Sequence, residues 1–143
     1  MPYRLLDEAP TADVGFRAWG ATLDQCFQAA ADATLDTMLG NAADLQLLQR
    51  RTLRVEADGL DLALLRFLEE LIFYKDAQSL FLRVTSVRVV HEAQRCTVEA
   101  IGEGEEIDAS RHHLSADVKA VTLHKLGVRQ TADGWEATVV LDV

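Results

Sequence analysis

Two aspartates near opposite ends of the chain supply the oxygen donors that a hard metal ion prefers. Asp142 is followed only by Val143, so its side-chain carboxylate neighbours the terminal carboxylate of Val143. Asp13 lies on the polar side of an alternating stretch near the N-terminus. Carboxylate and carbonyl oxygens suit Ca²⁺, Mg²⁺ or Mn²⁺, whereas thiolates suit softer metals. Asp13 and Asp142 could share a cation if their strands were neighbours; the alternative is that both are solvated.

A second candidate cluster comprises Asp108, His112 and His113. Neutral imidazole binds transition metals and titrates near neutral pH, so these residues could hold a metal ion or support acid–base chemistry. Adjacent side chains of an extended segment point in opposite directions, however, so the two rings can hardly bind the same ion. A solvated surface loop is the favoured interpretation. A metal-dependent hydrolase that uses Asp108 and His112 with Asp13 and Asp142 is a minor alternative.

The familiar signatures of catalysis and nucleotide binding are missing. Gly102 and Gly104 match the start of a dinucleotide-binding fingerprint, but no third glycine follows, and Glu105 and Glu106 would repel a pyrophosphate. The sequence has no Gly-x-x-x-x-Gly-Lys loop, no Gly-x-Ser-x-Gly elbow and no Cys/His spacing suited to structural zinc. No nucleophile–base pair is visible either, so the pattern favours a protein that catalyses no reaction itself.

The composition indicates one acidic domain, residues 1–143. Its 14 Lys and Arg residues against 23 Asp and Glu residues give a net charge of −9. That balance works against direct RNA binding, because phosphate contacts need clustered Lys and Arg. No stretch is apolar enough for a membrane helix, and no signal peptide is recognisable, so we expect a cytoplasmic protein. Cys26 and Cys96 are expected to be reduced core residues.

Hydrophobic spacing predicts the elements that must position these residues. Residues 3–8 and 12–19 are expected to form strands, the second with a period of two. Thr22 can cap a helix that Gly40 ends, because apolar residues recur there at spacings of three and four. The face opposite the core carries a row of aspartates and so lies in water.

Hydrophobic spacing predicts the elements in the rest of the chain as well. Residues 52–57 predict a strand, and residues 61–78 predict a second helix whose charged side chains, Lys75 among them, are expected in water. The sequence therefore predicts an α+β fold in two layers, with a mostly antiparallel, mixed sheet and both helices packed on one face. The expected C-terminal strands are 81–91, 95–102, 118–130 and 136–143.

Three ordered segments resemble the archease family. They are Thr11 to Gly15 with the helix that follows, Leu64 to Leu71, and the strand Asp117 to His124. The chain also ends as archeases do, with an aspartate before a β-branched residue. The resemblance spans nearly the whole length in order, so a chance match of one short motif does not explain it.

The resemblance implies a non-catalytic protein that activates a GTP-dependent RNA ligase. That ligase joins RNA ends that carry a 3′-phosphate or a 2′,3′-cyclic phosphate, in tRNA splicing or RNA repair. An archease promotes its guanylylation and multiple turnover, and RNA is contacted only through the ligase. The alternative is a chaperone or general protein-binding module, a role also suggested for the family, which would use exposed apolar surface instead.

The resemblance also implies a set of site residues. A divalent-metal site, associated with calcium, carries over to Asp13, Asp142 and Val143, and Asp108 matches a nearby acidic position less closely. Lys119 corresponds to a lysine associated with activation. Many archeases have a histidine where this chain has Pro10, so an imidazole role is lost at that position, whereas Asp13 is retained.

Overall fold

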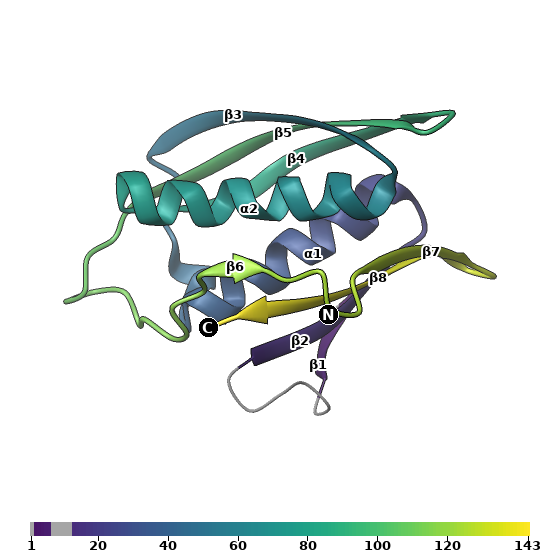
Figure 1. Cartoon of the computed structure of the whole chain (residues 1–143). Helices are drawn as coiled ribbons and strands as arrows, with labels where there is room; N and C mark the ends of the chain where they lie inside the picture. The colour runs from purple at the N-terminus through teal and green to yellow at the C-terminus, as the bar shows by residue number, and fades with distance from the viewer. Residues whose placement is uncertain (1, 7–12) are drawn as a thin grey trace.

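The computed structural model describes residues 2–6 and 13–143 and contains two antiparallel β-sheets with two long helices between them (Figure 1). Pro10 and the chain between the first two strands lie outside these residues. The elements, in chain order, are β1 (Tyr3–Leu6), β2 (Asp13–Gly20), α1 (Leu23–Met38), a 3₁₀ turn η1 (Ala42–Asp44), β3 (Gln49–Asp58), α2 (Leu60–Gln78), β4 (Leu80–Glu92), β5 (Arg95–Glu106), β6 (Ala120–Val121), β7 (Gly127–Thr131) and β8 (Gly134–Asp142).

The strands divide between a five-stranded and a three-stranded sheet. The first has the order β1-β2-β8-β6, with β7 also paired to β8, and the second has the order β3-β5-β4. Helix α1 packs against β2 and β8 of one sheet and β4 of the other, and α2 likewise contacts strands of both sheets. Figure 1 shows the three-stranded sheet above the helices and the five-stranded sheet below them. The helices therefore fill the interior between the sheets.

Helix α1 begins where the sequence predicts. The Thr22 side chain accepts a hydrogen bond from the Gln25 N–H at 3.2 Å, which satisfies one of the free amides at the helix start. The Gln25 side chain in turn accepts the N–H of Ala21, the residue before the cap, at 2.9 Å. The buried rings of Phe27 on α1 and Phe67 on α2 stack with their centroids 6.0 Å apart. Aromatic packing thus joins the two helices at the centre of the core.

The class of fold and most of the elements are confirmed. The molecule is α+β, its strand pairs are antiparallel, and both helices lie within two residues of their expected bounds. Cys26 and Cys96 are free and buried, and burial raises the pKa of the Cys26 thiol to about 11. Within the described residues, neither helix combines the length and apolar character needed to cross a lipid bilayer. The division of the strands into two sheets, with the helices between them, is the difference from the two-layer expectation.

The expected strand over residues 118–130 is interrupted. Five residues lie between Val121 and Gly127, whereas only two lie between their β8 partners, Leu141 and Thr138. The extra residues form a turn in which the Leu126 N–H bonds to the Leu123 carbonyl at 3.2 Å. The strand is thus split into β6 and β7, because its two halves pair with β8 in different registers.

The expectation that Lys75 lies in water is wrong. Only 8% of its side chain is exposed, and its ammonium group bonds to Oδ1 of Asp76 at 2.7 Å and Oδ1 of Asp117 at 2.8 Å. Burial by itself lowers the pKa of Lys75, but Asp117 and Asp76 together raise it above its ordinary value. Helical periodicity could not show this pairing, because Asp117 is distant in sequence and comes from the loop before β6.

Gly104 offers a direct test of strand packing. A Cβ atom at this position on the central strand β5 would lie 1.7 Å from the Phe81 carbonyl oxygen of β4, so the two strands would have to separate. We expect Gly104→Ala to lower the free energy of unfolding by about 1–3 kcal/mol in urea denaturation. The matched change Gly127→Ala, where a Cβ meets nothing within 4 Å, should cause no loss. Equal effects of the two changes would contradict this packing.

Candidate functional site

The ladder between β2 and β8 brings Asp13 and Asp142 together as direct cross-strand partners. Side chains of directly opposed residues in an antiparallel pair lie on the same face, with Cβ atoms about 4.5–5.5 Å apart. Both aspartates are partly exposed. Two carboxylates so placed repel each other, and a cation between them would relieve that repulsion. The strands that carry Asp13 and Asp142 are therefore neighbours, a point that the sequence alone did not decide.

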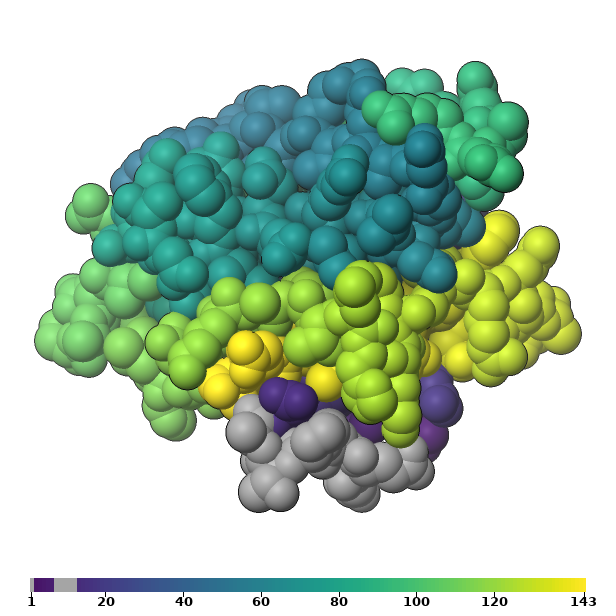
Figure 2. Space-filling model, viewed as in Figure 1, coloured from purple at the N-terminus to yellow at the C-terminus, as the bar shows by residue number. Residues whose placement is uncertain are grey.

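Asp142 is held from its other side by the segment that leads into β6. The Lys119 N–H donates to the Asp142 carbonyl at 2.8 Å, and Ala120 is the β6 partner of Asp142. Figure 1 shows the end of β8 between β2 and β6, and in Figure 2 yellow atoms of the C-terminal residues reach the surface between the green segment around β6 and the purple start of β2. The backbones of Asp13, Asp142 and Lys119 thus meet at one corner of the five-stranded sheet.

The loop before Lys119 is anchored at several points. The Ser115 and Ala116 amides donate to the Met38 and Thr37 carbonyls at the end of α1, at 2.9 and 3.0 Å. The Lys75 hydrogen bond lowers the pKa of Asp117, and the positive charge of Lys119 acts in the same direction. Lys119 itself is exposed. Its side chain is therefore accessible from solvent, while its backbone is fixed by the hydrogen bond to Asp142.

Asp108 is organised by its own loop. Its carboxylate accepts hydrogen bonds from the Ser110 amide and hydroxyl at 3.0 and 2.7 Å, and these bonds lower the pKa of Asp108. Across residues 2–6 and 13–143, no three Asp, Glu, His or Cys side chains gather closely enough to hold a metal ion. The structure therefore brings Asp13 and Asp142 together with the adjoining Val143, and leaves Asp108 outside this pair.

The expectation of a solvated loop is wrong for His112 and right for His113. His113 is exposed, but only 5% of His112 is exposed, and its ring packs edge-on against Phe81 with centroids 5.6 Å apart. Its Nδ1 accepts the Asp108 N–H at 2.8 Å, so the proton resides on Nε2, which lies 3.3 Å from Oε2 of Glu105. His112 therefore supports the loop from inside.

Sequence reasoning missed Glu105, the buried centre of this loop. Glu105 is 3% exposed, forms an ion pair with Arg111 and accepts the Gln46 N–H at 2.7 Å. The hydrogen bond from Arg111 is the main reason that the pKa of Glu105 falls to about 2; burial opposes the shift, and Gln46 and His112 assist it. The only sequence feature that pointed to this ion pair is the spacing of six residues between Glu105 and Arg111, which is a weak signal.

Sequence similarity extends over almost the entire chain. The Archease protein family (MTH1598/TM1083) matches residues 3–143. The chain belongs to the archease family. Among its relatives, protein archease of Pyrococcus abyssi and that of Thermococcus kodakarensis are each 32% identical to it over 134 residues, which cover 93% of this chain and 94% of the relative.

Solved structures support the same assignment of the fold. This archease superposes on the solution structure of Methanobacterium thermoautotrophicum protein 1598 with a TM-score of 0.84 and 26% identity, covering 99% of both chains. A crystal structure of an archease from Thermotoga maritima, described as a possible chaperone, gives a TM-score of 0.62 at 16% identity, covering 94% of this chain and 93% of that one. The second likeness concerns the fold alone.

The ion pair of Glu105 predicts how stability depends on pH. Because folding lowers the pKa of Glu105 from 4.5 to about 2, its ionised form stabilises the fold above the unfolded pKa, and this contribution is lost as the pH falls through that interval. We expect Glu105→Gln to be less stable than the wild type near pH 7, with a difference that shrinks between about pH 4.5 and pH 2 in urea denaturation.

The exposed neighbour Glu106 provides the matched control for this measurement. Glu106→Gln removes the same charge without touching the ion pair, so its effect near pH 7 should be small. A difference between wild type and Glu105→Gln that stays constant down to pH 2 would contradict the assigned role of Glu105.

Proposed function

We propose that this archease activates a GTP-dependent RNA ligase through a divalent cation held by Asp13 and Asp142. The observation that carries the proposal is the direct pairing of these two residues across β2 and β8. Family membership supports it, since the resemblance implies an activator of such a ligase in tRNA splicing or RNA repair. The archease supplies the site, and the ligase performs the chemistry of joining RNA.

The donors at this corner suit a hard cation. Two carboxylates on one face, with the main-chain oxygen of Val143 beside them, match the oxygen ligands of Ca²⁺ or Mg²⁺. These donors are fewer than the six to eight ligands that Ca²⁺ takes. The remaining positions are open to water or to a group from the partner, so the site should bind more tightly when the ligase completes it.

Lys119 and an apolar neighbour extend this corner into a docking surface. Lys119 is exposed beside Asp142 and can offset negative charge on the nucleotide or RNA that the ligase holds. Leu123, two residues after β6, is 71% exposed and adds an apolar side chain to the same segment, further along β8 from the carboxylates. Lys119 thus supplies charge that can orient a partner, and Leu123 supplies apolar area that can add affinity.

The chaperone alternative makes a different prediction about the carboxylates. A general protein-binding role depends on apolar surface, so suppression of client aggregation should persist when Asp142 is neutralised. Ligase activation should not persist. The same variant therefore separates the two functions.

The activator function is tested by multiple-turnover ligation with the cognate ligase. We expect wild-type archease in substoichiometric amount to accelerate joining of 3′-phosphate RNA ends, and Asp13→Asn or Asp142→Asn to reduce that stimulation by at least about tenfold. Asparagine preserves size and removes the charge that binds the cation. The protein without ligase should join no RNA.

The control is Asp133→Asn, which neutralises an exposed aspartate in the turn between β7 and β8, at the other end of β8. This variant should stimulate ligation as the wild type does. Full stimulation by both Asp13→Asn and Asp142→Asn, with the fold retained, would contradict the proposed site.

A further inference from the structure

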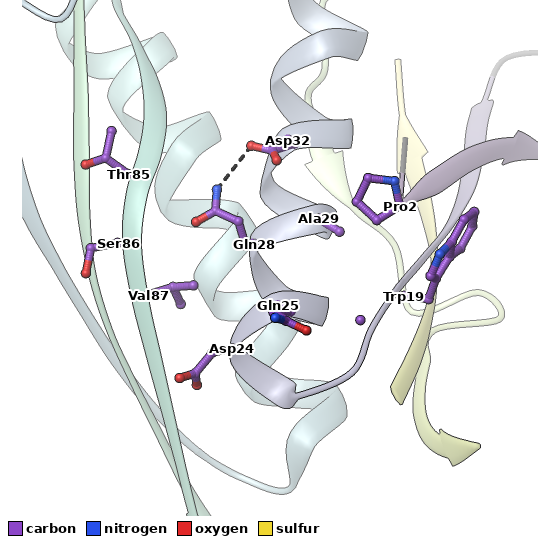
Figure 3. Close-up of a pocket in the computed structure, with 11 residues that line it drawn as sticks. Pro2, Trp19, Asp24, Gln25, Gln28, Ala29, Asp32, Thr85, Ser86 and Val87 are labelled. Carbon is purple, nitrogen blue, oxygen red and sulfur yellow. Dashed lines mark hydrogen bonds between the residues drawn. The ribbon is translucent and has the colours of Figure 1, made fainter. Parts of the chain in front are cut away.

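A second surface feature, a groove of about 550 Å³, runs along α1 at the end of β2 opposite to Asp13. Figure 3 shows Gln28 and Asp32 of α1 in the floor, Val87 of β4 on one side, and Pro2 with Trp19 on the other. Asp13 and Trp19 are six residues apart on the same strand, which corresponds to roughly 20 Å. The groove is therefore separate from the Asp13–Asp142 corner.

The wall formed by β4 is the edge of the three-stranded sheet. Edge strands present backbone N–H and C=O groups that another chain can pair with. Helix α1 covers this edge at two points: Gln28 donates to the Val84 carbonyl at 2.6 Å, and Asp24 accepts the Val89 N–H at 2.7 Å. Natural proteins often cover the edge of a sheet with a helix. Here the helix side chains bond to the edge at Val84 and Val89, and the backbone between these two residues is the part to consider.

The backbone of Val87 faces the groove between these two hydrogen bonds. The Val89 N–H points away from β5, because it bonds to Asp24. Val87 is two residues earlier in an uninterrupted register with β5, so its N–H and C=O point the same way. A register shift between Val84 and Ser86 ends the regular stretch on the other side. Between the two hydrogen bonds from α1, the N–H and C=O of Val87 are therefore presented to the groove, where an extended segment could pair with this one residue.

The groove is also negatively charged. Among the residues that the structure describes, the charged ones that line it are Asp24 and Asp32, and none of the lining residues is basic. Arg83 lies 3.5 Å from Asp32 and Gln28 donates a hydrogen bond to the same carboxylate at 3.1 Å, yet burial raises the pKa of Asp32 above its ordinary value. A cationic group in the groove would therefore stabilise the ionised form of Asp32. Trp19, 40% exposed on the facing wall, can cover the aliphatic stem of a lysine or arginine and attract its charge.

We propose that this groove binds an extended, positively charged segment of a partner protein, which pairs with the backbone of Val87 and places a lysine or arginine between Trp19 and Asp32. Backbone pairing supplies affinity for any extended segment, and the carboxylates select the cationic ones. The site does not depend on the cation at Asp13 and Asp142, and a partner bound here leaves that corner accessible.

The test is an NMR titration of the ¹⁵N-labelled chain with an acetylated, amidated hexapeptide of alternating threonine and lysine. We expect saturable shifts of the Val87 amide and the Trp19 indole N–H. The same peptide with glutamate in place of lysine should leave both signals unmoved. Asp32→Asn should weaken binding of the lysine peptide by roughly fivefold, because one charge contact is lost.

Two further results separate this site from the proposed ligase function. Asp13→Asn should bind the lysine peptide as the wild type does, even though it should no longer stimulate ligation. Thermal unfolding of Asp32→Asn checks that the fold is retained. No shifts at millimolar peptide, equal shifts with both peptides, or unchanged affinity of a folded Asp32→Asn would overturn the proposal.

Discussion

The register of the β2–β8 ladder is the constraint on which the candidate site depends. Asp13 faces Asp142 because Phe16 faces Val139 and Ala18 faces Ala137 along the same pair of strands. Those four apolar residues are fully buried, so a slip of one residue would turn them toward solvent. The core therefore fixes the separation of the two carboxylates, and their mutual repulsion is tolerated because the burial of the neighbouring side chains outweighs it.

The remaining elements support the same corner from the other side of β8. Segment 115–121 bonds in turn to the end of α1, to Lys75 of α2 and to β8, so the backbone at Lys119 is anchored to both helices. The buried Glu105 ion pair with Arg111 stabilises the start of the same loop. The carboxylate pair and the exposed lysine are therefore presented on a rigid frame, and such preorganisation favours recognition of one partner geometry.

Local patterns in the sequence predict much of this architecture, and long-range contacts account for the rest. The helix capped by Thr22 and the faces of Asp13 and Asp142 follow from spacing, because periodicity and capping are properties of neighbouring residues. The burial of Lys75 and His112 does not follow from spacing. Lys75 is paired with Asp117 and His112 packs against Phe81, and both partners are distant in sequence. Separation of the strands into two sheets likewise depends on which side of each helix a strand covers.

Calcium titration calorimetry of the full chain measures whether Asp13 and Asp142 act together on one cation. We expect one bound ion per chain, and a loss of affinity of at least about tenfold in Asp13→Asn and in Asp142→Asn. The double variant should bind calcium scarcely more weakly than either single variant, because both changes remove the same site. Calcium affinity that is unchanged in the folded double variant would show that these two carboxylates do not bind the ion.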